Sequence, residues 1–216
     1  MFENIKIPDN ITDIYIDVGL SHNAPHTVEW LSSNPNAFVF GFEPVKKNCE
    51  RVLERIKNLG FEDRFKLFEC AVDNVDKPQI KNFYITCNSQ VEGDHGQSSL
   101  YELTLKNSGG CEYWIDEVSP TLCINLSELF ESVDWKRFNN ISCLKTDTQG
   151  NDLNIMKSIK KYFDKIPLVY CESYTFNHYD KNDDDPNFIY QYMTSNGYQL
   201  FNSSIGSADH FYKRVV

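Results

Sequence analysis

Two carboxylates and one glycine, placed where short apolar runs end, are the residues best suited to hold a ligand. The run at 14–18 contains Asp17 and stops at Gly19, and the run at 37–42 ends on Glu43. In open parallel sheets, ligands bind outside the carboxyl ends of the strands. A carboxylate accepts hydrogen bonds, and a glycine lets the backbone approach a ligand closely. We therefore expect Asp17, Gly19 and Glu43 to hold a nucleoside-type cofactor.

The glycine spacing narrows the class of cofactor. A dinucleotide needs a Gly-rich turn beside its phosphates, but Ser21 and Ala24 stand where the further glycines would be. The phosphate-binding loop that ends in Gly-Lys-Ser/Thr is also absent. S-adenosylmethionine carries a sulfonium cation and no phosphate. Its site needs one close backbone approach, acidic groups near the cation and a carboxylate for the ribose, and Asp17, Gly19 and Glu43 meet that demand.

The elements that must position these residues alternate between strand and helix. Apolar runs predict strands at 12–18, 37–43, 65–72, 142–147 and 168–172, and a final antiparallel pair at 198–201 and 210–214. Helical spacing predicts helices at about 24–33, 45–59, 127–133, 152–161 and 188–196. This alternation implies an α/β fold with a mostly parallel sheet and helices on both faces. We predict a single domain over residues 1–216, with a variable, irregular insert at about 74–121 that holds a strand at 82–86.

Composition limits the partners and the compartment. The net charge of -10 argues against a nucleic-acid backbone as partner, because phosphate binding requires clustered Lys and Arg. No apolar run is long enough to cross a bilayer, so no membrane partner is expected. The first ten residues lack the basic and apolar regions of a secretion signal. Seven cysteines without a close pair favour reduced thiols. We expect a cytoplasmic protein.

Several motifs resemble those of the FkbM-type S-adenosylmethionine-dependent methyltransferases, which belong to the class I Rossmann-like group. They are Ile16-Asp17-Val18-Gly19, Gly41-Phe42-Glu43-Pro44, Ala71-Val72-Asp73, Ser98-Ser99-Leu100, the stretch 144–152 and Glu172. The stretch Lys145-Thr146-Asp147-Thr148-Gln149-Gly150 is the most specific, since the family typically shows Lys-x-Asp-x-Glu/Gln-Gly there. The resemblance spans about residues 12 to 214.

The resemblance implies a seven-stranded sheet whose last strand is antiparallel. It implies that Asp17 and Gly19 lie near the methionine part of the cofactor, Glu43 on the ribose and residues 70–73 beside the adenine. The cofactor-binding residues expected in this way are Asp17, Gly19, His22, Glu43, Cys70, Ala71, Asp73 and Ser98. Residues 20–25 depart from the family, which usually has a small residue, Asn and a second Gly after the first glycine.

Acceptor chemistry is expected at the ends of the fourth and fifth strands. Methyl transfer is an in-line displacement, and a hydroxyl acceptor benefits from a general base or a metal. Asp147 is the first candidate for catalysis, and His95 and His178, in loops, are alternative bases. Glu172 and Gln149 are expected to bind the acceptor. No His, Cys and carboxylate spacing matches a zinc site, although a weak Mg²⁺ site at Asp147 and Glu172 stays open.

The predicted function is therefore S-adenosylmethionine-dependent O-methylation of a hydroxyl on a small molecule, sugar or glycan. Aromatic residues in the variable segments suit a sugar, although scattered aromatics more often fill a small core: Tyr101, Tyr113, Trp114 and Tyr174. N- or carboxyl methylation stays open. Two rivals are a non-catalytic binding module, suggested by the altered loop 20–25, and an NAD-dependent oxidoreductase, against which the missing glycines count.

Overall fold

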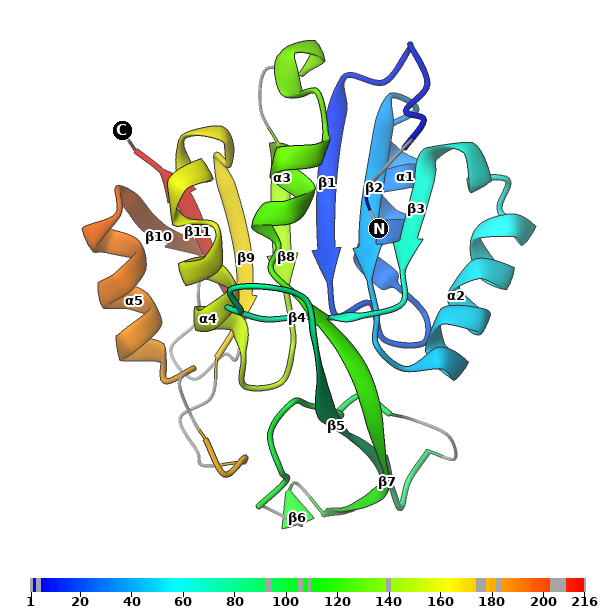
Figure 1. The fold of residues 1–216 in the computed structure, drawn as a ribbon, viewed down its shortest axis with the longest axis vertical. Coiled ribbons are helices and arrows are strands. Elements are labelled where there is room, and N and C mark those ends of the chain that lie inside the picture. Colours follow the sequence, from blue (N-terminus) through cyan, green and yellow to red (C-terminus); the bar gives the residue numbers. More distant parts are fainter. Residues whose placement is uncertain are drawn as a thin grey trace.

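A seven-stranded sheet in the order β10-β11-β9-β8-β1-β2-β3 forms the centre of the fold (Figure 1). The computed structural model describes residues 2, 5–91, 95–104, 107–108, 110–138, 141–173, 178–181, 184–202 and 209–215. Tyr174, one of the aromatics noted above, lies outside these ranges. The parallel strands are β1 (Asp13–Val18), β2 (Ala37–Phe42), β3 (Phe65–Phe68), β8 (Ile141–Thr146) and β9 (Leu168–Glu172). Strand β11 (Asp209–Arg214) is antiparallel to both β9 and β10 (Tyr198–Asn202), so the predicted sheet is confirmed.

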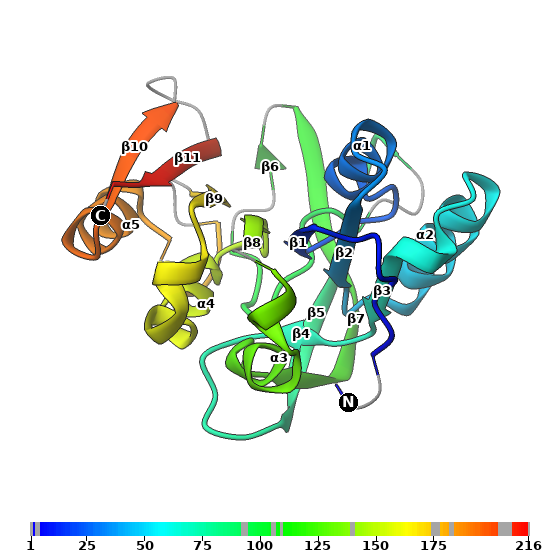
Figure 2. The ribbon, with the colours of Figure 1, turned by 90° about the horizontal axis from the view of Figure 1, so that it is seen from above.

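Helices cover both faces of this sheet (Figure 2). Helices α1 (Pro25–Ser33) and α2 (Lys46–Asn58) cover one face, and α3 (Ser127–Ser132), α4 (Asp152–Ser158) and α5 (Pro186–Ser195) cover the other. Short 3₁₀ turns occupy Glu62–Arg64, Trp135–Arg137 and Lys160–Lys165. Side chains alternate across a strand, so Phe38, Phe40 and Phe42 of β2 enter the core below α3 and α4, while Val39 packs toward α1 and α2.

A second, smaller sheet projects from the carboxyl-end edge of the main one. Its centre is an antiparallel ribbon of β5 (Gln79–Asn88) and β7 (Cys111–Ile124). Strand β4 (Ala71–Val72) pairs parallel with the end of β7, and β6 (Asn107–Ser108) pairs with its start. Figure 1 shows the ribbon leaving the edge where the arrowheads of β1, β2 and β3 lie.

Two expectations for this region differ from the structure. The segment 65–72, expected as one strand, is divided between β3 in the main sheet and β4 in the second. The strand expected at 82–86 extends over Gln79–Asn88, and its partner β7 was not expected at all. Most side chains of β7 are exposed or half-buried, so the strand lacks the apolar alternation by which a sequence reveals one.

The described part of the chain contains no helix that is both long and apolar enough to cross a membrane.

Candidate functional site

A cavity of about 250 Å³ opens at the carboxyl ends of β1, β2 and β8, where residues of the insert cover it. Eight of the predicted site residues line it: Gly19, Glu43, Cys70, Ala71, His95, Ser98, Asp147 and Gln149. The other five predicted residues do not: Asp17, His22, Asp73, Glu172 and His178. The strand ends therefore do bring the two halves of the predicted site, around Glu43 and around Asp147, to one cavity.

At Gly19 the end of β1 lies close against the residue that follows β8. A Cβ atom at Gly19 would lie 1.9 Å from the backbone oxygen of Asp147, and its φ of +81° is in the left-handed region. The backbone nitrogen of Gly19 donates to Phe42 at 2.9 Å, and that of Asp147 donates to Val18 at 3.0 Å. The glycine is thus required by the contact between two strand ends, whether or not a ligand approaches it.

Lys145 joins the ends of β1 and β8 beneath the cavity. Its Nζ donates to the carbonyl oxygen of Gly19 at 2.6 Å and lies 3.2 Å from Asp17 Oδ1 and 3.6 Å from Asp147 Oδ2. The side chain of Lys145 is 3% exposed. Burial lowers the pKa of the ammonium, but Asp17 and Asp147 raise it more, so the net shift is upward. The lysine therefore stays charged and holds the ends of β1 and β8 together.

Asp17 serves this internal ion pair and is 1% exposed. Its Oδ2 also accepts a hydrogen bond from Thr27 Oγ1 of α1 at 2.7 Å. Both oxygens thus face groups of the protein, which places the carboxylate beneath the site and off the cavity wall. The sequence reveals Lys145 as part of a motif, but only the fold shows that it is the partner of Asp17.

Glu43 is a buried carboxylate on the cavity wall. Its Oε2 accepts from the backbone nitrogen of Ser21 at 2.9 Å. Its Oε1 accepts from the backbone nitrogen of Val45 at 2.9 Å and from Asn48 Nδ2 at 3.2 Å. Burial raises the pKa of Glu43 to about 7, against the opposing effect of these hydrogen bonds and of Lys145. The other atom of the Asn48 amide, Oδ1, is buried without a hydrogen-bond partner among the described residues.

The altered loop 20–25 is built around this carboxylate. Ser21 and Ala24 take positive φ values of 57° and 41°, the conformations that glycines often supply. Leu20 is buried and Pro25 begins α1. The contact from Ser21 nitrogen to Glu43 closes the loop over the end of β2. His22, predicted to touch a cofactor, places Nδ1 3.3 Å from Ser21 Oγ and is not among the residues that line the cavity.

Gln149 connects Asp147, at the other end of the cavity, to Glu172, which does not line it. Its Nε2 donates to Asp147 Oδ1 at 2.8 Å and to Glu172 Oε2 at 2.6 Å. The phenol of Tyr179 donates to Gln149 Oε1 at 3.0 Å, and the hydroxyl of Ser99 donates to the Gln149 carbonyl at 2.6 Å. Burial raises the pKa of Asp147, but Lys145, Glu172 and Gln149 together lower it further than burial raises it. Asp147 is therefore an anion at neutral pH and a weak base.

His95 is the predicted base that the structure places on the cavity wall. The imidazole is buried, and its Nδ1 lies 2.8 Å from the carbonyl oxygen of Thr86. A carbonyl only accepts, so Nδ1 carries the proton and Nε2 carries the lone pair of the neutral ring. His178 is off the wall, and its carbonyl oxygen accepts from the backbone nitrogen of Thr104 at 2.7 Å. Burial lowers the pKa of His178.

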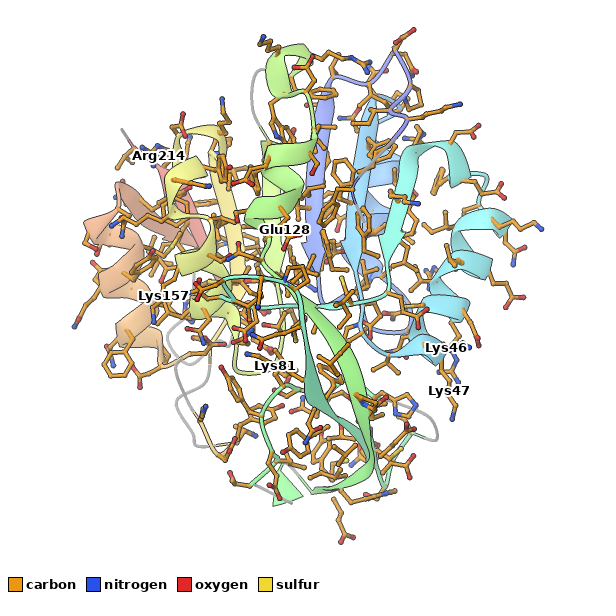
Figure 3. All side chains as sticks on the ribbon, in the orientation of Figure 1. Lys46, Lys47, Lys81, Glu128, Lys157 and Arg214 are labelled. Carbon is orange, nitrogen blue, oxygen red and sulfur yellow. The ribbon has the colours of Figure 1, made fainter. Side chains whose placement is uncertain are left out.

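The remaining predicted residues have structural roles as well. Asp73 is held by Lys81 at 2.5 Å and by the backbone nitrogen of Asn74 at 2.7 Å. Figure 3 places Lys81 beside the ribbon, so this ion pair ties β5 to the end of β4. Ser98 Oγ accepts from the backbone nitrogen of Thr86 at 3.0 Å. Burial raises the pKa of the Cys70 thiol to about 12, so it is an inert part of the wall.

Asp184 belongs to the acidic run Asp183-Asp184-Asp185, whose sequence is typical of a solvated loop, but the structure places this residue in the interior. The side chain is fully buried, and its oxygens accept from the backbone nitrogens of Asp152 at 2.7 Å and Leu153 at 2.8 Å. It therefore caps α4, the helix that follows the Asp147 loop, and a carboxylate is favourable at that end of a helix. A run of acidic residues in sequence cannot reveal which member turns inward. Among the described residues, no group of three or more His, Cys, Asp and Glu is arranged to hold a metal ion.

Comparison with known proteins gives a consistent result. The family described as the methyltransferase FkbM domain matches residues 17–200. The solved structure of methyltransferase FkbM from Methylobacillus flagellatus KT is similar, with a TM-score of 0.53 and 14% identity, covering 97% of this chain and 45% of that chain. This chain thus spans less than half of that protein's length. A putative rRNA methylase from Clostridium thermocellum has a TM-score of 0.51 and 11% identity, covering 95% of this chain and 89% of that chain. No curated protein matches the sequence.

Proposed function

Because the chain belongs to the FkbM methyltransferase family, as its motifs predict, we propose that it transfers the methyl group of S-adenosylmethionine to a hydroxyl of a small molecule, sugar or glycan. One observation carries this proposal. The wall of one cavity holds Glu43, a buried hydrogen-bond acceptor, at one end. At the other end it holds Asp147 and Gln149, which are joined by a hydrogen bond. Glu43 suits the hydroxyls of a ribose, and the pair Asp147 and Gln149 suits a polar methyl acceptor.

The chemistry of the wall fits this cofactor better than a dinucleotide. The described residues that line the cavity include Glu43 and Asp147 but no Lys or Arg. A pyrophosphate would meet two carboxylates there, whereas a sulfonium is favoured by them. The buried Asn48 Oδ1 needs a hydrogen-bond donor, which a ribose hydroxyl would supply. These features also count against the oxidoreductase alternative.

The acceptor end has groups that can bind and deprotonate a hydroxyl. S-adenosylmethionine, when bound, supplies an electrophilic methyl on a positively charged sulfur. His95 Nε2 has a lone pair and is the base that takes the proton of the acceptor hydroxyl. Asp147 stays an anion beside Lys145 and orients the acceptor or the imidazolium. The Gln149 amide holds Asp147 and Glu172 in fixed positions. Net charge of -10 supports an acceptor other than nucleic acid.

Calorimetric titration with S-adenosylmethionine and S-adenosylhomocysteine tests the proposal. Binding at micromolar concentrations is expected. Folded protein that takes up neither ligand well above that range would remove the methyltransferase proposal and favour the non-catalytic module. The oxidoreductase alternative is checked separately by the absorbance of reduced nicotinamide.

The choice between the two candidate bases gives a first prediction. His95→Gln should lower turnover by about 100-fold, because a glutamine cannot take the proton, and should leave the affinity for S-adenosylhomocysteine within about threefold. The matched change His178→Gln, off the cavity wall, should alter turnover less than about threefold. Initial rates with saturating cofactor and any accepted hydroxyl compound provide the measurement. Equal losses in the two variants would exclude His95 as the base.

The burial of Glu43 gives a prediction about pH. Because its pKa is raised to about 7, part of the free protein carries a proton on this carboxyl near neutral pH. A ribose hydroxyl that donates to Glu43 favours the ionised form. The affinity for S-adenosylhomocysteine should therefore fall as the pH drops below about 7, by at most about tenfold per pH unit. Calorimetry between about pH 6 and about pH 8 measures this dependence.

Glu43→Gln is the control for this pH effect, since the amide does not ionise. Its affinity should be weaker and should lose the dependence on pH. An affinity of the unaltered protein that is constant across the range would contradict contact between Glu43 and the ribose.

A further inference from the structure

Asn48 has an unexplained polar atom at the site. It lies in the first turn of α2, is 2% exposed and lines the cavity. Its Nδ2 donates to Glu43 Oε1 at 3.2 Å, and its Oδ1 is buried with no partner among the described residues. Buried acceptors are almost always satisfied, and one left without a donor on a cavity wall points to a donor supplied by a ligand.

The hydrogen bonds of Glu43 show how much of the ligand it can hold alone. A carboxylate oxygen has two lone pairs. Oε1 already accepts two hydrogen bonds, from Val45 and Asn48, whereas Oε2 accepts one, from Ser21. Glu43 therefore has one lone-pair direction left for a ligand. A ribose presents two neighbouring hydroxyls, and one of them needs another acceptor.

We propose that Asn48 Oδ1 accepts a hydrogen bond from one ribose hydroxyl while Glu43 Oε2 accepts from the other. The inference deepens the proposed function and rests on it. The oxygen and nitrogen of an amide share one carbon, so Oδ1 lies beside the carboxylate to which Nδ2 is bonded. This neighbourhood favours the ribose over the adenine amino group as its partner. Asn48 then selects for a ligand with both hydroxyls.

Analogues that lack one hydroxyl test this directly. The dissociation constants of S-adenosylhomocysteine and of its 2′-deoxy and 3′-deoxy analogues are measured by calorimetry for the unaltered protein and for Asn48→Leu. In the unaltered protein each deoxy analogue should bind about tenfold more weakly. In Asn48→Leu, S-adenosylhomocysteine itself should bind about tenfold more weakly. In this variant one deoxy analogue should bind as tightly as S-adenosylhomocysteine does, and the other should still bind about tenfold more weakly than it.

The pattern separates direct contact from an indirect role. If both hydroxyls keep their full contributions to the affinity in Asn48→Leu, the proposal is overturned. If both contributions vanish together, the proposal is also overturned, because Asn48 would then act only by orienting Glu43. If Asn48→Leu does not fold, Asn48→Ala removes the same oxygen and takes its place. Failure of the unaltered protein to bind S-adenosylhomocysteine would overturn the proposed function, and this inference with it. Binding with the wrong pattern overturns the inference alone.

Discussion

Gly19→Ala should destabilise the fold more than an alanine at any other glycine that the structure describes. The new Cβ would lie 1.9 Å from the Asp147 oxygen and 2.9 Å from its carbonyl carbon, and both are backbone atoms of a neighbouring strand end. Backbone cannot rotate away as a side chain can, so the ends of β1 and β8 must separate. We expect the free energy of unfolding to fall by more than about 4 kcal/mol, measured by urea denaturation.

Gly60→Ala is the matched control for backbone strain. Gly60 also has a positive φ, +72°, but a Cβ there would meet no atom within 4 Å. Its cost should be the conformational penalty alone, about 1–2 kcal/mol. The difference between the two variants measures the contact between the strand ends. Similar losses of stability at both positions would show that the strand ends separate at little cost. Gly19 would then be required only for its positive φ.

Separation of the strand ends has a functional consequence. Glu43 and Asp147 belong to different strands, and the cavity between them depends on their spacing. Any folded Gly19→Ala protein should therefore bind S-adenosylhomocysteine poorly. Gly19, predicted to let a cofactor approach the backbone, therefore has a packing role as well.

The central sheet could be predicted because its strands have a local signal. The runs that end at Val18, Phe42 and Thr146 are mostly buried, and the run that ends at Phe42 is apolar throughout, as is typical of a parallel strand between helices. The carboxyl ends of such strands meet at one edge, so Glu43 and Asp147 could be placed near each other from the sequence alone. The motifs added the family, and through it the number of strands and the antiparallel direction of the last one.

The partners of the charged residues could not be predicted in the same way. A carboxylate at a strand end looks alike in sequence whether it faces a ligand, as Glu43 does, or a buried lysine, as Asp17 does. The cap of α4 by Asp184 joins residues more than thirty positions apart. Strand β7 pairs with β5 across a long connection, and few of its side chains are buried. Each of these contacts depends on tertiary placement, which no local pattern encodes.

Lys145→Met should remove the charge that compensates Asp17 while keeping most of the volume of the side chain. Asp17 is 1% exposed, and its Oδ1 faces Lys145 Nζ at 3.2 Å. A methionine leaves this carboxylate buried without a counter-charge and also removes the hydrogen bond to the Gly19 carbonyl. Breaking a buried ion pair from one side typically costs about 3–5 kcal/mol, and we expect a loss of that size in urea denaturation.

Lys81→Met provides the comparison for an ion pair nearer the surface. Lys81 pairs with Asp73, and its side chain is 35% exposed, against 3% for Lys145. Water reaches the lysine end of this pair, and the backbone nitrogen of Asn74 still donates to Asp73 in the variant, so the loss should be smaller than that of Lys145→Met. The two variants remove the same chemical group, but they differ in the burial of the lysine and in the hydrogen bonds left to the carboxylate.

The double variant Asp17→Asn, Lys145→Met distinguishes a lost charge from a lost packing contact. The unaltered protein keeps Lys145 charged through the neutral range, because the net shift of its pKa is upward. An asparagine at position 17 leaves no uncompensated charge, so the double variant should be more stable than Lys145→Met by at least about 1 kcal/mol. A double variant no more stable than Lys145→Met would show that the methionine disturbs packing instead. Recovery of stability would establish that electrostatic compensation by one buried lysine holds together the strand ends that carry Gly19 and Asp147.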